Sequence, residues 1–276
     1  MGAAVLLLAL VGSLAAFGGA RPGAPSAPAV VWAVGDGADG SRPGLALSRR
    51  IVAEDPKVFL YLGDVYPDGT AKDYAQRYRP AYGRLDSRTL PTPGNHEWPQ
   101  RVEGYLPYWG RAHGAPEPSY YAAETAGWQL LSLNSEEDHG AGSEQLAWLR
   151  RQLAARAGTC RIAFWHRPRF SAGSHGDQAD MAPVWGAVRG QAAIVLNGHD
   201  HNLQRFKPIG GTTAFVVGAG GGERYPLKGD DSRLAYANDT VAGALRLELN
   251  RDSARFSLID PGGHTLDRGT IPCHAR

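Results

Sequence analysis

The sequence predicts an α/β fold in one large domain. Strand-like and helix-like runs alternate from residue 29 onward, the early strand-like runs are apolar nearly throughout, and the C-terminal part holds only strand-like runs. A chain of 276 residues is long enough for one large domain or two small ones. Because no internal repeat and no interior linker marks a boundary, we expect a single domain.

The first elements follow from short local signals. Residues 29–34, AVVWAV, are predicted to form a strand, and residues 44–55 a helix. Ser41 is a suitable N-cap for that helix, and Pro43 suits its first turn. Residues 57–62, KVFLYL, predict a second strand that is buried on both faces, since it is apolar after its lysine.

The remaining elements continue the alternation. Further strands are predicted over 128–134, 161–166 and 192–198. The helix predicted over 143–157 has its apolar face on Leu146, Leu149 and Leu153. The tail from Thr212 to Ile271 contains the strand-like runs TAFVVGA, AGALRLELN and RFSLI, so we expect the chain to end in a β-meander.

Composition excludes several classes of protein. A hydrophobic content of 43% and a charged content of 20% are ordinary for a globular protein, which argues against disordered and fibrous chains. The formal net charge of +2 gives no general field that would attract nucleic acid or an acidic membrane surface. Any anion must therefore be bound locally.

The N-terminal segment predicts export. Residues 1–20 contain no charged side chain, and their apolar run, residues 3–17, is shorter than the ~20 residues of a membrane-spanning helix. We expect a signal peptide over 1–20, a Pro- and Ala-rich linker over 21–28 and the folded domain over 29–274. The mature protein would then be secreted, periplasmic or extracellular and free of the membrane. A retained anchor is the alternative, because the basic region that usually begins a signal peptide is missing.

Metal-competent side chains follow the apolar runs in five separate segments. A lone Gly-Asp or histidine after a strand is usually a turn or a structural residue, but five such segments leave that interpretation little room. The carboxyl ends of strands in an open α/β sheet gather at one edge, and His199 and His201 are spaced to present both imidazoles on one side. Oxygen and imidazole donors together suit zinc, manganese or iron rather than calcium or Cu(I). The residues are Asp36, Asp64, Tyr66, Asn95, His96, Glu97, His166, His199 and His201.

The ordered set of Asp36, GD at 63–64, GNHE at 94–97, His166 and GHDH at 198–201 resembles the calcineurin-like metallophosphoesterases. Within them the chain is most similar to the purple acid phosphatase branch, and the resemblance covers it from about residue 29. It implies a four-layer α/β/β/α fold, in which helices flank a central β-sandwich. It also implies two metal ions, which in two-metal phosphatases lie about 3.5 to 4 Å apart.

The resemblance implies a role for each of these residues. Asp36 and His201 would bind the first metal ion, Asn95, His166 and His199 the second, and Asp64 would bridge both because a carboxylate has two oxygens. His96 would assist the leaving group, and His175, nine residues after His166, would contact substrate. A mobile loop residue is the alternative for His175. Glu97 would either orient His96 or be a solvated acid.

The chain departs from the family pattern at the first metal ion. Many members have Asp-x-His at the first segment, whereas here Ala38 stands in place of the histidine. Purple acid phosphatases use the tyrosine of GDxxY, but Tyr66 in GDVY comes one position early, and it could instead be a packed loop residue. If Tyr66 is a ligand, we expect Fe(III) with a divalent iron, zinc or manganese ion. Otherwise we expect two divalent ions.

Three further features are less specific. The GAGGG segment at 218–222 suggests a tight turn at the rim of the site, and Arg167, Arg169 and Arg205 are either a phosphate clamp or ordinary surface charge. Cys160 and Cys273 would form a disulfide in an oxidising compartment and remain two thiols in a reducing one. Such a bridge would hold the C-terminal tail beside the site.

These residues predict a secreted, dinuclear metal-dependent hydrolase of phosphoric esters. We expect a phosphomonoesterase in which metal-bound hydroxide attacks in line, with a small-molecule phosphate ester as substrate and no nucleic-acid partner. Two alternatives stay open. A phosphodiesterase would have the same metal centre, and a non-catalytic phosphate-binding protein would have the same fold.

Overall fold

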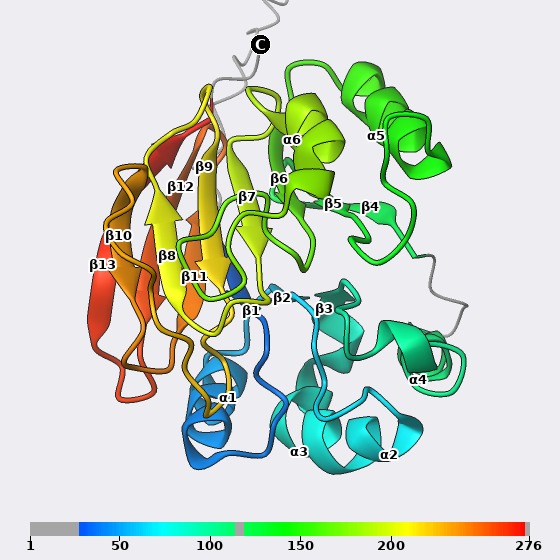
Figure 1. Cartoon of the computed structure of the whole chain (residues 1–276), viewed down its shortest axis with the longest axis vertical. Helices are drawn as coiled ribbons and strands as arrows, with labels where there is room; N and C mark the ends of the chain where they lie inside the picture. Colours follow the sequence, from blue (N-terminus) through cyan, green and yellow to red (C-terminus); the bar gives the residue numbers. More distant parts are fainter. Residues whose placement is uncertain (1–27, 114–118, 274–276) are drawn as a thin grey trace, which may run out of the picture.

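Two mixed β-sheets packed face to face carry the fold of residues 28–113 and 119–273, which the computed structural model describes (Figure 1). Helices cover the outer side of each sheet, so the four-layer α/β/β/α architecture is confirmed. The predicted signal peptide over 1–20 and residues 21–27 of the predicted linker lie outside the described residues. The domain boundaries at 29 and 274 stay predictions.

The first sheet joins the N-terminal strands to the C-terminal meander. Strands β1, β2 and β3 pair in parallel, and β1 also pairs antiparallel with β11, so that Val31 lies between Val58 and Leu247. The strand order is β13 (Thr265–Pro272), β12 (Ser253–Ile259), β11 (Ala244–Leu249), β1 (Ala29–Val34), β2 (Val58–Tyr61) and β3 (Thr89–Pro91). The predicted meander is present in part, because AGALRLELN and RFSLI form β11 and β12, which continue into β13, whereas TAFVVGA belongs to the second sheet.

The second sheet has a parallel centre with antiparallel edges. Strands β5, β6, β7 and β9 are parallel, whereas β4, β8 and β10 pair antiparallel with their neighbours. The strand order is β10 (Leu234–Asn238), β8 (Leu203–Phe206), β9 (Thr213–Val217), β7 (Ile194–Asn197), β6 (Cys160–Phe164), β5 (Trp128–Ser132) and β4 (Tyr121–Thr125).

The main core lies between the two sheets. It is built from alternate residues of the strands, because successive side chains of a strand point to opposite faces. Val31 and Leu60 from the first sheet and Ile162 and Leu196 from the second are fully buried in it. The intervening residues, such as Trp32 and Val195, face the helices instead, which explains why the central strands are apolar nearly throughout.

The helices bury their apolar faces on the outer sides of the sheets. Helix α1 (Arg42–Glu54) begins as predicted at Ser41, whose Oγ accepts from Gly44 N at 3.2 Å. The helices that follow are α2 (Ala71–Asp73), η1 (Tyr74–Tyr78), α3 (Arg79–Tyr82) and η2 (Gly83–Arg88), between β2 and β3, and η3 (Trp98–Gln100) and α4 (Tyr105–His113), after β3. Residues of η1, α3, η2 and α4 pack with α1 in one buried cluster. Helix α5 (Glu144–Ala155), η4 (Ala179–Met181) and α6 (Ala182–Val188) lie on the second sheet. Figure 1 shows the two groups on different sides of the molecule.

Helix α5 buries Leu146, Leu149 and Leu153, as its predicted apolar face requires. No helix within residues 28–113 and 119–273 combines the length and the apolar character needed to cross a bilayer. The predicted strand over 161–166 ends earlier, at Phe164, so that His166 lies in the loop beyond it.

Cys160 and Cys273 form a disulfide, as expected for an oxidising compartment. The expectation that this bridge lies beside the site is wrong. Cys160 is the first residue of β6, whereas His166 follows the other end of that strand. The bridge therefore ties β13 to the end of β6 that is remote from His166.

Replacing both cysteines by serine is expected to destabilise the fold while leaving activity at low temperature largely intact. The bridge joins residues 113 positions apart, and a closed loop of this size contributes about 5 kcal/mol in the chain-entropy model. Urea unfolding of the oxidised protein and of the Cys160→Ser/Cys273→Ser variant measures the difference. Equal unfolding midpoints would show that the bridge contributes nothing.

Candidate metal centre

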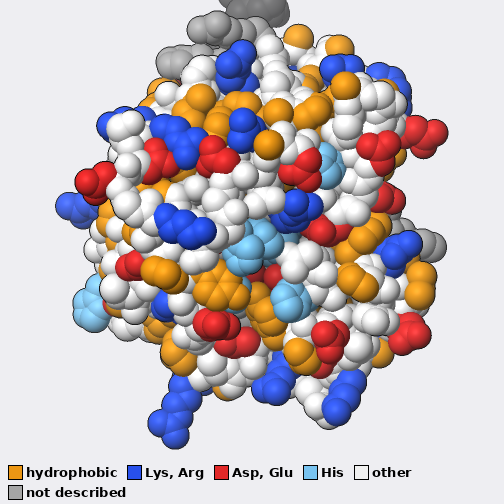
Figure 2. Space-filling view, viewed as in Figure 1, with side chains coloured by type: hydrophobic (Ala, Val, Ile, Leu, Met, Phe, Trp, Pro, Cys, Tyr) orange, Lys and Arg blue, Asp and Glu red, His pale blue; other side chains and the backbone are white. Residues whose placement is uncertain are grey.

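The metal-competent side chains lie where the carboxyl ends of both sheets meet. Asp36, Asp64 and Asn95 follow β1, β2 and β3 of the first sheet, while His166 and His199 follow β6 and β7 of the second. The sequence predicted a single sheet edge, whereas the structure draws the donors from two sheets. Figure 2 shows histidine side chains gathered near the middle of one face of the molecule.

One donor set forms around the hydroxyl of Tyr66. Its Oη lies 2.7 Å from His201 Nε2, 3.1 Å from Asp36 Oδ1 and 3.3 Å from Asp64 Oδ2. His201 Nε2 is also 3.5 Å from Asp36 Oδ1. The hydroxyl has one hydrogen for two carboxylate oxygens, and ionised carboxylates only accept, so this set presents more lone pairs than hydrogens.

Tyr66 points into the site although it comes one position early. In a regular strand such a shift would turn the side chain to the other face. The backbone is not regular here, because Gly63 and Asp64 have φ of 93° and 66°, and Val65 then pairs with Ala38. Ala38 itself is fully buried. Burial and the carboxylates of Asp36 and Asp64 raise the pKa of Tyr66 far above its usual value, so phenolate needs a nearby cation.

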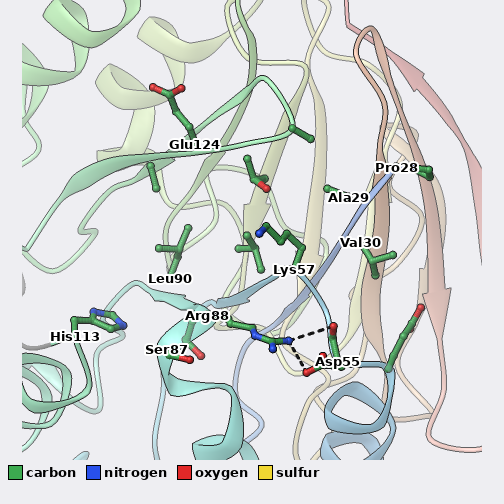
Figure 3. A pocket seen from close by; sticks show the side chains of 16 residues that line it. Pro28, Ala29, Val30, Asp55, Lys57, Ser87, Arg88, Leu90, His113 and Glu124 are labelled. Carbon is green, nitrogen blue, oxygen red and sulfur yellow. Dashed lines mark hydrogen bonds and ion pairs between the residues drawn. The ribbon is translucent and has the colours of Figure 1, made fainter. Parts of the chain in front are cut away.

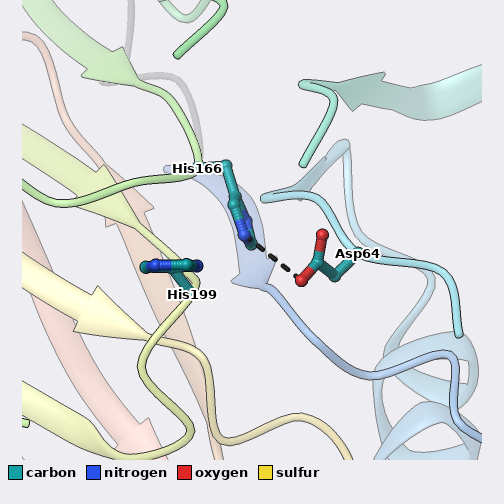
Figure 4. A group of neighbouring side chains, drawn as sticks. All are labelled: Asp64, His166 and His199. Atoms are coloured by element: carbon teal, nitrogen blue, oxygen red, sulfur yellow. Dashed lines mark ion pairs between the residues drawn. The ribbon is translucent and has the colours of Figure 1, made fainter. Parts of the chain in front are cut away.

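A second donor set forms around His166. Asp64, His166 and His199 each offer one ligand atom, and these atoms lie within 4.8 Å of one another (Figure 4). His166 Nε2 is 3.3 Å from Asp64 Oδ2 and 3.1 Å from Asn95 Oδ1. The rings of His166 and His199 meet edge to face, with centroids 5.0 Å apart.

Asp64 belongs to both sets through one oxygen. Its Oδ2 lies 3.3 Å from both Tyr66 Oη and His166 Nε2, whereas Oδ1 accepts from His96 N at 3.1 Å. We expected each oxygen of Asp64 to face one metal ion, but Oδ2 alone lies beside both donor sets. Burial opposes the charge on Asp64, yet His166 and His96 hold its pKa below its usual range.

The donor chemistry around His166 fits a metal ion. Its Nδ1 lies 2.8 Å from Leu62 O, and because a carbonyl only accepts, Nδ1 carries the hydrogen. Nε2 lies between Asn95 Oδ1 and Asp64 Oδ2, so with its proton displaced by a metal ion it would add a third electron pair to theirs. Burial opposes a positive charge on His166, but Asp64 outweighs it and raises the pKa of His166 to about 10. The negative charge of Asp64 favours a metal cation for the same reason.

Backbone strain gathers at the proposed ligands. Five non-glycine residues in the described part of the chain have positive φ, and Asp36, Asp64 and His199 are three of them. A positive φ at such a residue costs about 1 kcal/mol or more of folding free energy, and it persists where surrounding contacts hold the backbone in place. Here Asp36 Oδ2 accepts from His199 N at 2.9 Å, and Asp36 N donates to Gly63 O at 3.0 Å. The three strained loops thus support one another.

His199 and His201 turn toward different donor sets. The expected strand geometry, with both imidazoles on one side, does not apply, because His199 has φ of 73° and lies beyond β7. Burial, with the neighbouring His166 and His175, lowers the pKa of His199 to about 2, so its ring is neutral as a metal ligand requires. Burial opposes a charge on His201, but Asp36 outweighs it and raises the pKa of His201.

His96 and His175 flank these sets. His96 Nδ1 contacts Pro67 O, and its Nε2 is 3.8 Å from Asp64 Oδ2, close to the centre but outside hydrogen-bonding distance. The His175 ring lies over that of His199, with centroids 4.0 Å apart. Both side chains are more than a third exposed, so a ligand at the centre can reach them.

Glu97 and Tyr225 have positions in the site that the sequence did not predict. Glu97 is fully buried, and its Oε2 accepts from Asp64 N at 3.0 Å and Gly94 N at 3.1 Å, so neither expected role applies. Burial and the Asp64 charge raise its pKa well above the usual range. Tyr225 stacks on His201, with centroids 3.9 Å apart. The GNHE motif signals Glu97, but Tyr225 follows no recognisable motif.

The arginines near the site are held by acidic partners, as surface charge would be. Arg205 makes a two-nitrogen contact with Asp267, Arg167 lies 3.3 Å from Asp180, and Arg169 lies 3.8 Å from an aspartate of its own loop. The glycine-rich segment does lie at the rim. A Cβ on Gly218 would come within 2.3 Å of a backbone oxygen of the GHDH loop, which only glycine avoids.

A separate hollow of about 1020 Å³ lies at the amino ends of β1, β2 and β3 (Figure 3). Lys57, Leu90 and Glu124 are among the residues that line it, and Arg88 pairs with Asp55 at its edge. The metal-competent side chains follow the carboxyl ends of the same strands. The hollow is therefore distinct from the candidate metal centre.

If Tyr66 binds Fe(III), the oxidised protein should show a visible phenolate-to-iron charge-transfer band, and Tyr66→Phe should abolish it. The expectation follows from the position of Oη among Asp36, Asp64 and His201, and from the hard anionic character of phenolate. Absorption spectra with iron analysis test it, and Tyr120→Phe serves as a control because Tyr120 packs on Trp148 instead. Active protein with zinc or manganese, no iron and no band would assign Tyr66 to packing.

Comparisons with known proteins agree with this geometry. A family model described as calcineurin-like phosphoesterase matches residues 30–203. Human tartrate-resistant acid phosphatase type 5 is 29% identical over 143 residues, which are 48% of this chain and 43% of the relative. Purple acid phosphatase 21 of Arabidopsis thaliana is 27% identical over 236 residues, 72% of this chain and 52% of the relative. The chain thus spans about half the length of the curated relatives it matches.

Solved structures share the fold at low identity. A purple acid phosphatase from yellow lupin has a TM-score of 0.76 at 18% identity, covering 92% of this chain and 55% of its own. GAP50, the anchor in the inner membrane complex of Plasmodium, has a TM-score of 0.74 at 12% identity, covering 90% of each chain. A dimetal phosphatase from Danio rerio has a TM-score of 0.61 at 14% identity, covering 89% of this chain and 99% of its own.

Proposed function

Since the chain belongs to the calcineurin-like phosphoesterase family, we propose that it is an exported hydrolase of phosphoric monoesters that uses two metal ions. The observation that carries this proposal is the position of Asp64. Its Oδ2 is shared by two sets of donors, one around Tyr66 and one around His166, as a bridging carboxylate requires.

Each metal ion has its own set of protein donors in this proposal. Asp36, Tyr66 and His201 hold one ion, Asn95, His166 and His199 hold the other, and Asp64 belongs to both. When bound, such a pair lowers the pKa of a coordinated water and neutralises charge on phosphoryl oxygens. The chain keeps the donors in place through backbone amides, since His199 N and His96 N donate to the two aspartates.

Two histidines act on the substrate in this proposal. His96 is fixed at Nδ1 by Pro67 O, which leaves Nε2 to give a proton to the leaving oxygen as the ester bond breaks. His175 contacts the phosphoryl group from the side of His199. Neither residue is assigned as a ligand in this proposal.

Export is supported by the bridge between Cys160 and Cys273, because disulfides persist mainly in oxidising compartments. The apolar segment predicted as a signal peptide agrees with export.

The fold alone does not decide between catalysis and another role. GAP50 has this architecture and is described as an anchor, so a non-catalytic protein is the rival function. His96 argues for catalysis, because a protein that only binds phosphate has no need of a proton donor beside the centre. A phosphodiesterase would use the same centre, so the type of ester is decided by measurement.

Hydrolysis of p-nitrophenyl phosphate and bis(p-nitrophenyl) phosphate, each with and without a chelator, separates the three functions. We expect chelator-sensitive turnover that is faster with the monoester. Faster turnover of the diester would establish the phosphodiesterase. Binding of inorganic phosphate by the metal-loaded protein without turnover of either ester would establish the non-catalytic role.

A further inference from the structure

Asp200 lies between His199 and His201, yet its carboxylate faces away from both donor sets toward another loop. It is fully buried and accepts from Ser171 Oγ, from His175 N at 3.0 Å and from His175 Nδ1 at 3.2 Å. All three donors belong to the loop at residues 171–175. The carboxylate therefore serves as the anchor of that loop.

The loop is shaped to wrap around this carboxylate. A Cβ on Gly173 would lie 2.5 Å from Asp200 Cγ, so only glycine permits the approach. Ser171 Oγ in turn accepts from Gly173 N and from Gln204 Nε2, both at 2.9 Å, and Gln204 Oε1 accepts from Ala172 N at 2.8 Å. This buried network leaves the loop little freedom to place His175 elsewhere.

The contact with Asp200 also determines which ring nitrogen of His175 is free. An ionised carboxylate offers only acceptors, so the nitrogen that binds it must carry hydrogen. Nδ1 is therefore the protonated nitrogen, and Nε2 on the other side of the ring is left for a ligand. The ring lies 4.0 Å from His199 and 5.2 Å from Tyr225 between centroids, and the side chain is 38% exposed.

We propose that Asp200 is a positioning residue, which binds Nδ1–H of His175 and orients the ring, so that Nε2 shares a hydrogen with a phosphoryl oxygen. This inference rests on the proposed function, in which His175 contacts substrate. The hydrogen bonds from His175 to Asp200 tie the His175 loop to the GHDH segment, which also supplies two proposed ligands. The substrate contact and the metal centre therefore depend on one backbone segment.

Asp200→Asn should weaken phosphate recognition through His175. With the amide oxygen at the Oδ1 position, the NH₂ group would face Ser171 Oγ, whose lone pairs already accept from Gly173 N and Gln204 Nε2 and whose hydrogen would lose its acceptor. We expect KM for p-nitrophenyl phosphate and the inhibition constant of inorganic phosphate to rise about 10- to 100-fold, with a smaller change in kcat, as usual for lost supporting contacts. Metal analysis must find the wild-type number of ions in the variant.

A double-mutant cycle distinguishes positioning from a general structural effect. In a His175→Ala background, Asp200→Asn should change KM by less than about twofold, because its partner is already gone. Asp177→Asn is the matched control, since Asp177 Oδ1 accepts from Ser171 N of the same loop without contacting His175. A penalty from Asp200→Asn that is equal with and without His175 would overturn the proposal.

Nitrogen NMR gives a test that needs no turnover. The protein is labelled with ¹⁵N-histidine and measured both zinc-loaded and metal-free. The signals of His175 are those that disappear from the spectrum of His175→Ala. We expect Nδ1 to carry the hydrogen, whereas hydrogen on Nε2 alone would overturn the proposal. If no ester is hydrolysed, the proposed function fails. The positioning role is then still decided by this spectrum and by the affinity of Asp200→Asn for inorganic phosphate.

Discussion

Asp64→Asn is expected to release at least one metal ion and to lower kcat/KM by about 10³-fold, equivalent to about 4 kcal/mol of transition-state stabilisation. The loss follows from the hydrogen bond that His96 N donates to Asp64 Oδ1. In the variant this donor selects the amide oxygen for the Oδ1 position and so turns the NH₂ group toward both donor sets. The NH₂ group, which is neutral and carries hydrogens, then replaces the anionic Oδ2 that both donor sets share.

Asp68→Asn is the matched control for this change. It makes the same substitution four positions later, on an exposed part of the same loop. Metal content and turnover should stay at wild-type values there, while both fall in Asp64→Asn. Wild-type metal content together with wild-type turnover in Asp64→Asn would remove Asp64 from the centre.

His96→Ala is expected to keep both metal ions and to lower kcat by about 10² to 10⁴, the range usual for loss of a general acid. The side chain lies near the centre without belonging to a donor set, since its Nε2 is 3.8 Å from Asp64 Oδ2. The loss should be smaller with p-nitrophenyl phosphate than with an alkyl phosphate, because p-nitrophenolate leaves without a proton.

The control for His96→Ala is His264→Ala, in the turn between β12 and β13, where His264 is exposed and pairs with Asp260. Its metal content and kcat should match the wild type. An equal loss of kcat with aryl and alkyl esters in His96→Ala would argue against proton donation. Loss of a metal ion from that variant would make His96 a ligand instead.

Most of the central strands and several site residues were predictable because they depend on local pattern. Asp36 and Asp64 directly follow apolar strands, and a polar residue at the carboxyl end of a strand is a frequent signal of a ligand site. Ser41 and Ser143 likewise mark the starts of α1 and α5 through capping bonds that involve neighbouring residues alone. Such features need no knowledge of the rest of the fold.

The direction of Tyr66 was not predictable from spacing. Strand periodicity turns a residue that comes one position early to the wrong face, and the positive φ of Gly63 and Asp64 removes the periodicity at that point. In this conformation Asp64 N donates to the buried Glu97, as does Gly94 N. That contact joins segments 33 positions apart, so no local pattern reveals it.

Asp200 was overlooked for a related reason. It stands between two candidate ligands in the GHDH motif, and the sequence assigned it no role because its partner His175 lies 25 positions away. Edge strands such as β13 were missed because exposed residues such as Arg268 and Thr270 hide the alternation of a buried strand. Both failures concern features that only the assembled fold creates.

Metal analysis of protein purified without added metal tests the dinuclear centre most directly. The arrangement of two donor sets around Asp64 Oδ2 predicts two metal ions per chain, with loss of activity when a chelator removes them and recovery when they are restored. Fully active protein that contains one metal ion per chain, or none, would contradict the account.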